Sequence, residues 1–245
     1  MIERQLDVPT TAGATTTFIV HPDRDGPHPL VIFYMDAPAI REELRDMARR
    51  FATSGYYVML PNLYYRAGEM ELGPINPDPE HGSRKKMFEL MNGLTIDMVM
   101  EDTDALLAFA EADPAASTAK VGLVGYCMSG QFVVNAAARH ADKVAAGASV
   151  YGTFLVTDKP NSPHVMARKA RGELYFACAE IDVWAPAETI AALDASLKAD
   201  RINAEVEIYP GVHHGFAFPQ RPAYDKPSAE RHWERVLALF RRNLG

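Results

Sequence analysis

Short apolar runs alternate with longer amphipathic stretches along most of this 245-residue chain. Runs such as 30–34 (LVIFY) and 121–124 (VGLV) are continuous and rich in β-formers, as in strands buried on both faces of a parallel sheet. Stretches such as 96–112 repeat apolar residues at the helical spacing over several turns. This alternation predicts an α/β fold, with a mostly parallel sheet and helices on both of its faces.

The same pattern places the individual elements. Residues 62–82 are rich in proline, glycine and charge, and a loop of this length in a compact domain is usually functional or disordered. No stretch has the composition of a linker, so we predict a single domain over residues 1–245. Strands are expected at 2–8, 15–20, 30–34, 56–60, 121–124, 144–151, 173–178 and 204–209, helices at 40–54, 83–91, 96–112, 131–139, 187–199 and 228–243, and a second long loop at 153–171.

One stretch, residues 120–131 (KVGLVGYCMSGQ), joins a strand to a helix within a few residues. A nucleophile at such a corner is the nucleophile elbow of α/β-hydrolases, which is therefore the fold class that we predict. The corner strains the backbone, so its neighbours must be small. Gly125 stands two residues before Cys127, and Ser129 two residues after it. The thiol of Cys127 would then take the place of the usual serine.

The surroundings of Cys127 favour its role as a nucleophile. The N-terminus of the following helix carries a partial positive charge that favours a thiolate. The backbone N–H of Met128 is placed to donate to an oxyanion at the same helix start. Two alternatives remain, because a cysteine is often only a small buried hydrophobe and because Ser129 is a rival nucleophile. Ser129 would need small residues at positions 127 and 131, and Gln131 fits that poorly.

An acid and a base follow in the chain order that this fold uses, which is nucleophile, acid, histidine. Asp182 comes just after the strand expected at 173–178, and His214 just after the strand expected at 204–209. Both would emerge at the carboxyl edge of the sheet, where open α/β sheets bind their ligands. His214 would take the thiol proton, and Asp182 would hold its tautomer and stabilise the imidazolium.

Each of these two residues has a competing interpretation. Asp182 could cap the helix that begins at residue 187 or close a turn, and Glu180 is a second acid close by. His213 is adjacent to His214, and one of the two histidines is expected to be solvated or structural. Three candidate groups in triad order, each at the end of its own strand, favour catalysis over these alternatives.

Composition narrows the function further. A net charge of −7 and a pI near 5.6 argue against nucleic acid or an anionic membrane as a partner. The two cysteines fit a reducing compartment, and neither a signal peptide nor a membrane span is visible, so a cytoplasmic location is expected. No metal-ligand spacing and no nucleotide-binding glycine motif occurs, so we expect neither a metal nor a cofactor. We expect a monomer or a weak homo-oligomer.

The segments GYCMSG, AEIDVWAP and HHGFAF, together with residues 31–66, resemble the dienelactone hydrolase family. The resemblance runs from about residue 30 to the last helix. It implies a Cys–His–Asp triad of Cys127, His214 and Asp182, and an enzyme that hydrolyses carboxylic esters or lactones through a thioester, like a carboxymethylenebutenolidase. It also implies that the carboxylate of Asp36 lies beside the thiol and takes part in its activation, although the family usually has glutamate there. The second oxyanion donor would be the N–H of Ala37.

The same resemblance indicates which residues would contact a negatively charged substrate. Dienelactone-cleaving members hold the substrate carboxylate with two arginines. The first of these positions holds Lys86, with Arg84 nearby, and the second holds Phe218, with Arg221 close in sequence but not matched. Lysine lacks the bidentate fork of arginine, and phenylalanine cannot bind a carboxylate. The resemblance therefore implies an altered anion clamp. Aromatic residues are candidates to line a more apolar pocket: Tyr64, Tyr65, Phe88, Trp184, Phe216 and Phe218.

Two other functions stay open at this point. A protein with this fold could bind a small ligand without turnover, because one fold hosts many functions. The enzyme could also cleave another acyl bond, such as a thioester or a peptide. Against the first alternative, a binding protein has no need for a thiol, an acid and a histidine at three strand ends.

Overall fold

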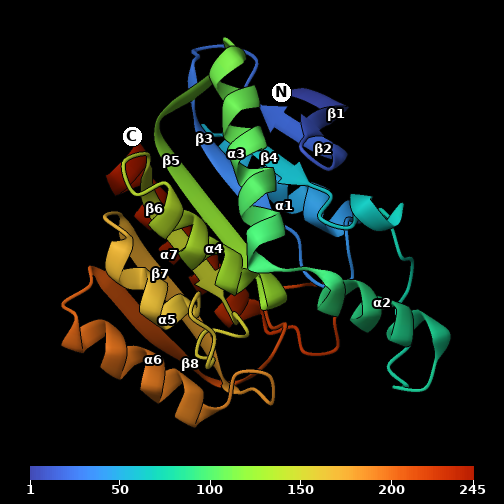
Figure 1. The fold of residues 1–245 in the computed structure, drawn as a ribbon, viewed down its shortest axis with the longest axis vertical. Coiled ribbons are helices and arrows are strands. Elements are labelled where there is room, and N and C mark those ends of the chain that lie inside the picture. Colours follow the sequence, from blue (N-terminus) through green and yellow to red (C-terminus); the bar gives the residue numbers. More distant parts are fainter. The chain divides into compact units, whose positions relative to one another are not determined.

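The computed structural model describes all 245 residues, which form two compact units, Met1–Thr118 and Ala119–Gly245. In Figure 1 strands and helices follow one another along the chain in both units, as the hydrophobic pattern predicts. No helix is both long enough and apolar enough to cross a membrane. The single domain expected from composition stays a prediction.

The first unit is built on strands in the order β1-β2-β4-β3. β1 (Ile2–Thr10) and β2 (Gly13–His21) form an antiparallel hairpin, and Gly13 allows the positive φ of 132° at which β2 begins. β2 also pairs antiparallel with β4 (Tyr57–Pro61), which pairs parallel with β3 (His28–Tyr34). β3 and β4 are buried at nearly every position, which explains their continuous apolar sequence.

Helices of the first unit pack on these strands through apolar faces. α1 (Glu42–Thr53) contacts β2 and β4, and α3 (Ile96–Ala112) contacts β1. The hydroxyl of Thr95 caps α3 by accepting a hydrogen bond from a backbone N–H of its first turn. The short helix η1 (Tyr65–Ala67) and α2 (Gly82–Gly93) occupy the segment between β4 and α3.

The second unit contains four parallel strands in the order β5-β6-β7-β8. β5 (Ala116–Tyr126) begins at the end of the first unit and is followed by β6 (Val144–Val150), β7 (Glu173–Ile181) and β8 (Ala204–His213). Because the strands are parallel, their carboxyl ends lie at one edge of the sheet. Every segment that follows one of these strands therefore begins at the same edge.

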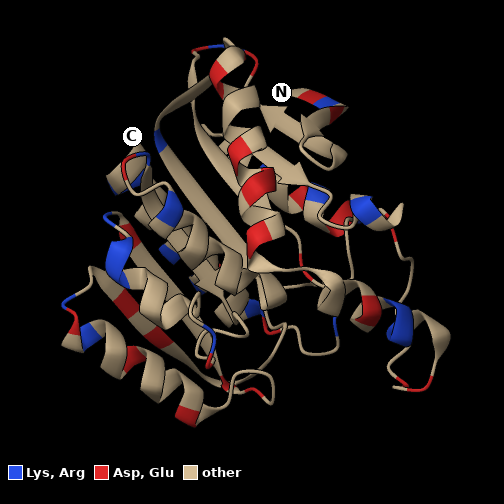
Figure 2. Ribbon diagram, in the orientation of Figure 1, with Lys and Arg blue, Asp and Glu red and all other residues tan.

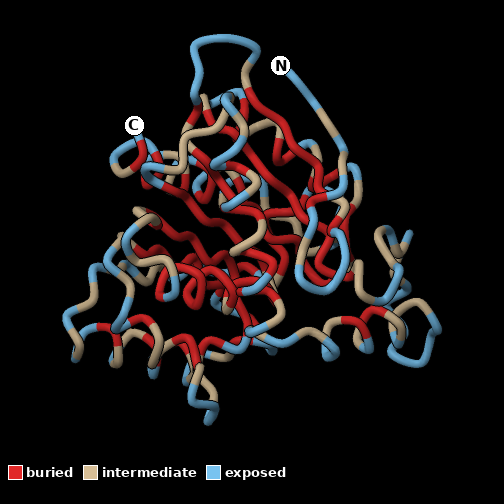
Figure 3. The backbone as a smooth tube through the Cα atoms, turned by 45° about the horizontal axis from the view of Figure 1, so that its top comes forward, coloured by how far each residue is buried: buried red, intermediate tan, exposed pale blue.

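Helices cover both faces of these four strands, which agrees with the predicted arrangement. In Figure 1, α4 lies in front of the strands and α7 (red) behind them, and the two helices contact β6 from opposite sides. Figure 3 shows that the buried backbone follows the strands, while the connecting turns are exposed. The helices are η2 (Cys127–Ser129), α4 (Gly130–Arg139), α5 (Pro163–Met166), η3 (Ala167–Lys169), α6 (Ala187–Ala199) and α7 (Lys226–Leu244).

Several boundaries differ from the predicted ones. The helices expected at 96–112 and 187–199 occur with those boundaries. β7 and β8 run on to Ile181 and His213, because these two residues pair with each other beyond a register irregularity that the local sequence does not reveal. The expectation of a loop throughout 153–171 is wrong, since α5 and η3 lie within it. Both are too short for periodicity to detect.

Acidic residues recur along α3 (Figure 2), and one of them is buried. Asp102 is 1% exposed and accepts hydrogen bonds from both terminal nitrogens of Arg66 at 2.8 Å. The hydroxyl of Tyr65 donates to the same carboxylate at 2.8 Å. This cluster fastens η1 to α3 within the first unit.

Replacing Asp102 with alanine is expected to lower the free energy of unfolding by about 2–3 kcal/mol, because the guanidinium of Arg66 loses its buried partner. Chemical denaturation would measure the loss. Glu101→Ala, an exposed neighbour on α3, is the control and is expected to change stability by less than about 0.5 kcal/mol. Equal losses in both variants would contradict the importance of the cluster.

Candidate active site

The corner after β5 has the geometry that its sequence predicts. Cys127 has a φ of 55°, in the left-handed region that is unfavourable for residues other than glycine. A Cβ atom at Gly125 would lie 2.6 Å from the carbonyl oxygen of Ser129, so no side chain fits at position 125. A Cβ atom at Gly130 would lie 2.5 Å from the Cα of Gly152, which lies just beyond the end of β6. Glycine at these positions lets the chain turn from β5 into α4.

Burial separates the two possible nucleophiles at this corner. Cys127 is partly exposed, whereas Ser129 is 0% exposed. The carbonyl oxygen of Cys127 accepts a hydrogen bond from the N–H of Thr153 at 2.9 Å, which fixes the corner to the segment after β6. Met128 follows Cys127 in η2 and leads into α4, where backbone N–H groups point toward the start of the helix. Of the two candidates at this corner, the thiol of Cys127 is therefore the one that solvent reaches.

Asp182 and His214 lie directly after β7 and β8, and their side chains meet. Nδ1 of His214 is 2.7 Å from Oδ2 of Asp182, although the residues are 32 positions apart. The other oxygen of Asp182 accepts hydrogen bonds from the N–H groups of Trp184 and Ala185 at 2.8 and 3.2 Å. The carboxylate is therefore held on one side by its own turn and on the other by the imidazole.

The structure distinguishes Asp182 and His214 from the neighbouring acid Glu180 and the neighbouring histidine His213. α6 begins after Pro186 without a side-chain cap, so Asp182 does not cap it, although it does close the turn before it. Glu180 is exposed and accepts a hydrogen bond from the N–H of Gly211 at 2.6 Å. His213 is exposed, whereas the side chain of His214 is only 12% exposed. The acid and the histidine that meet are thus Asp182 and His214.

The surroundings of His214 stabilise its protonated form. Burial lowers the pKa of His214, but the negative charge of Cys127 and the hydrogen bond to Asp182 outweigh it and raise the pKa to about 9. Nε2 is buried and makes no hydrogen bond of normal geometry, so Cys127 acts on the ring chiefly through its charge. The three side chains are therefore electrostatically coupled.

Aromatic side chains pack against His214, and one of them, Tyr151, was not identified from the sequence. The ring of Tyr151 meets His214 edge-on at 5.0 Å between centroids, and Phe216 packs against Tyr151 at 5.3 Å. Tyr151 has a φ of 37° at the end of β6. Its place at the end of a predicted parallel strand was the one signal that could have identified it. These aromatic side chains keep water from one side of the imidazole.

Asp36 and Ala37 lie in the segment that follows β3 in the first unit. Asp36 is 0% exposed, and both of its oxygens accept hydrogen bonds from the guanidinium of Arg41, at 2.6 and 3.2 Å. The carbonyl oxygen of Ala37 accepts a hydrogen bond from the hydroxyl of Tyr64 at 2.9 Å. Tyr64 is only 2% exposed, so it fixes the Ala37 segment instead of presenting its ring to solvent. The roles of Asp36 and Ala37 stay predictions.

The remaining substrate-binding candidates differ in exposure. The side chain of Lys86 is 41% exposed and lies 3.7 Å from Glu69, and Arg84 lies over the ring of Phe88. Trp184 is 47% exposed. Phe218 is 0% exposed and packs 5.3 Å from Tyr126, so contact with a substrate would pass through the residues that it supports.

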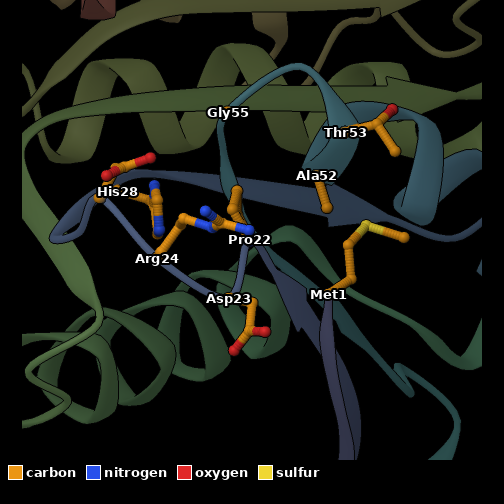
Figure 4. A pocket seen from close by; sticks show the side chains of 9 residues that line it. Met1, Pro22, Asp23, Arg24, His28, Ala52, Thr53 and Gly55 are labelled. Carbon is orange, nitrogen blue, oxygen red and sulfur yellow. The ribbon is translucent and has the colours of Figure 1, made fainter.

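Two surface hollows, one in each unit, contain none of these candidates. A hollow of about 640 Å³ in the first unit (Figure 4) mixes apolar residues with charged ones of both signs: Met1, Pro22, Asp23, Arg24, Asp25, His28, Ala52, Thr53 and Gly55. A smaller one of about 320 Å³ in the second unit lies where β5, β6 and β7 begin. The candidates Cys127, Asp182 and His214 lie at the opposite edge of the sheet, after the ends of β5, β7 and β8. No group of three His, Cys, Asp or Glu side chains is arranged to hold a metal ion.

The chain is similar in sequence to a family of hydrolases and to individual proteins named for related activities. The model of the "Dienelactone hydrolase family" matches residues 15–244. The chain is 28% identical over 246 residues to a "Putative carboxymethylenebutenolidase" of Methylorubrum extorquens, covering 98% of this chain and 81% of that protein. It is 24% identical over 243 residues to a "Probable 2-oxo-3-(5-oxofuran-2-ylidene)propanoate lactonase" of a Bradyrhizobium species, covering 98% and 94%.

A solved structure extends the likeness to three dimensions. The crystal structure of a "Putative Dienelactone Hydrolase" from Klebsiella pneumoniae matches with a TM-score of 0.86 and 25% identity, covering 98% of each chain. This likeness confirms the predicted α/β-hydrolase fold.

Because the pKa of His214 is raised in the folded protein, the free energy of unfolding should depend on pH. The usual value is 6.5, so the stabilisation is fully present below pH 6.5 and is lost as the pH rises through about 9. The difference in unfolding free energy between wild type and His214→Gln should shrink by on the order of 3 kcal/mol across this range. Denaturation at several pH values would measure it. His213→Gln is the control and should follow wild type; a constant difference for His214→Gln would contradict the coupling.

Proposed function

The chain belongs to the dienelactone hydrolase family of α/β-hydrolases, and from that premise we propose that it hydrolyses small carboxylic esters or lactones with Cys127 as the nucleophile. The observation that carries the proposal is the coupling of Cys127, His214 and Asp182 at the ends of three parallel strands. The curated relatives are named for lactone-cleaving activity, which supports the same bond type. The triad order matches the one that the fold uses.

In the first step, the thiolate of Cys127 attacks the carbonyl carbon of the ester, and the carbonyl electrons move to oxygen. The backbone N–H groups of Met128 and Ala37 would donate to this oxyanion. The intermediate collapses by breaking the bond to the alkoxy oxygen, which takes a proton from the imidazolium of His214. The products are a thioester on Cys127 and an alcohol, which remains attached to the acyl group when the substrate is a lactone.

In the second step, water attacks the thioester carbonyl while His214 accepts one of its protons. The carbon–sulfur bond breaks, the carboxylic acid leaves, and the thiolate and imidazolium are restored. Asp182 keeps Nδ1 of the ring protonated through both steps, so that Nε2 faces the reaction. The raised pKa of His214 suits this cycle, because the imidazolium is the acid that protonates the alkoxy oxygen in the first step.

Asp36 is assigned a supporting role in this proposal. The family resemblance assigns to its position a carboxylate that helps to activate the thiol. Burial lowers the pKa of Arg41, but the charges of Asp36 and Glu43 outweigh it and raise that pKa, so the guanidinium remains a charged partner. The shorter aspartate is therefore held in a defined orientation by two hydrogen bonds.

Loss of the thiol should abolish turnover if the proposal is right. Cys127→Ala is expected to lower kcat for a chromogenic ester by about 10⁴-fold or more. Ser129→Ala is expected to stay within about tenfold of wild type, because Ser129 is buried. Cys178→Ala is a matched control, since Cys178 is the other cysteine and is 3% exposed.

Other outcomes would point elsewhere. Activity that survives in Cys127→Ala and disappears in Ser129→Ala would make the serine the nucleophile. Failure of the wild type to turn over any ester, lactone, thioester or peptide would favour a protein that binds a ligand without turnover.

The clamp for an anionic substrate can be tested through Arg221. Its guanidinium lies over the ring of Phe218 at 4.9 Å, and its Cδ would be 3.0 Å from a Cβ atom at Gly215, the residue after His214. A cation so close to the triad can replace the arginine that position 218 lacks.

Arg221→Gln is expected to raise KM for an anionic enol-lactone about tenfold relative to KM for a neutral ester, because a charged hydrogen bond is lost. Steady-state kinetics on both substrates would show it. Arg241→Gln, an exposed arginine on α7, is the control. An unchanged ratio in Arg221→Gln would remove Arg221 from the clamp.

A further inference from the structure

Large apolar side chains are exposed on two segments that follow strands of the second unit. Phe154, which follows β6, is 42% exposed. Val183 and Trp184, which follow β7, are 84% and 47% exposed. We call these three residues the apolar rim. Exposed hydrophobic residues that gather at one place commonly mark a binding surface.

Both segments of the apolar rim are tied to the triad by backbone hydrogen bonds. The N–H of Thr153, next to Phe154, donates to the carbonyl of Cys127 at 2.9 Å. The N–H of Trp184 donates to the carboxylate of Asp182 at 2.8 Å. β6 and β7 are neighbouring parallel strands, so the two segments leave the same edge of the sheet. Both segments of the apolar rim therefore begin at the edge of the sheet that carries Cys127 and Asp182.

The backbone of Phe154 is strained. Its φ is 58°, a left-handed conformation that a bulky side chain disfavours and that glycine or asparagine adopts more easily. A ring that is 42% exposed recovers little of this cost by burial. Strained residues of this kind gather at ligand sites.

We propose that the apolar rim binds the hydrocarbon chain of the substrate's acyl group, so that this enzyme prefers esters with an extended apolar acyl chain. This inference rests on the proposed ester hydrolysis. The acyl group stays bonded to Cys127 from the first step to the second, whereas the alcohol leaves after the first. The acyl chain is thus the part of the substrate that remains beside Phe154, Val183 and Trp184, and each methylene covered there is removed from water.

The test compares kcat/KM for p-nitrophenyl acetate, butyrate and octanoate. In wild type, the octanoate is expected to exceed the acetate about tenfold. In Phe154→Asn and Val183→Ser this octanoate-to-acetate ratio should fall toward one. Phe154→Asn should also unfold at the same or a higher temperature, because asparagine tolerates the left-handed backbone. The matched control is Ile208→Ser on β8, since Ile208 is equally exposed at 48% and lies within a strand.

The outcomes separate this inference from the proposed function. If wild type cleaves the three esters with equal kcat/KM, the apolar rim does not bind the acyl chain, although the proposed ester hydrolysis stands. An octanoate-to-acetate ratio that is unchanged in both variants leads to the same conclusion. A fall of the ratio in Ile208→Ser as well would also overturn the apolar rim.

A second measurement does not need turnover. Cys127 is alkylated with N-ethylmaleimide and with N-octylmaleimide, whose double bond adds the thiol directly, and the two rates are compared. Faster reaction of the octyl reagent in wild type, lost in Phe154→Asn, supports the apolar rim even if no ester is cleaved. Equal rates for the two reagents in wild type overturn it.

Discussion

The hydrogen bond between Asp182 and His214 is the interaction on which the rest of the site depends. It joins the ends of β7 and β8, and the residues just before it, Ile181 and His213, pair directly in the sheet. The sheet thus brings the carboxylate and the imidazole together without help from a flexible loop. Burial of the ring lowers the pKa of His214, but the negative charge of Cys127 and the hydrogen bond to Asp182 outweigh it and raise the pKa to about 9, which suits the proposed chemistry.

Backbone strain recurs where strands of the second unit end. Cys127, Tyr151 and Phe154 all have positive φ values, and all follow the ends of β5 or β6. The glycines at 125, 130 and 152 allow the backbone to approach closely enough to hold the first of them. In the proposed function, the strain at Cys127 turns the thiol out of the sheet. At Phe154 it presents a ring to solvent, which folding alone would not favour.

The first unit contributes a separate and equally ordered network. Arg41 grips the carboxylate of Asp36, and the hydroxyl of Tyr64 holds the carbonyl of Ala37. These two contacts fix neighbouring residues of one segment from two directions, so the N–H and the carboxylate that the family resemblance singles out have little freedom to move. The substrate contact predicted for Tyr64 stays a prediction, and in this network its hydroxyl holds the Ala37 segment.

The sequence by itself determined the fold class, the helices at 96–112 and 187–199, and the identities of Cys127, Asp182 and His214 as candidates, because these follow from local periodicity and from glycine at a sharp corner. Only the tertiary structure decided that β7 and β8 reach as far as Ile181 and His213, since strand pairing sets where a strand ends. Burial of a side chain likewise depends on which distant segments of the same chain pack over it. Only the structure could therefore show that Phe218 is enclosed, whereas Phe154 and Val183 are exposed. A hydrophobic side chain looks the same in the sequence whether it fills the core or meets a ligand, and the difference lies in what the fold leaves uncovered.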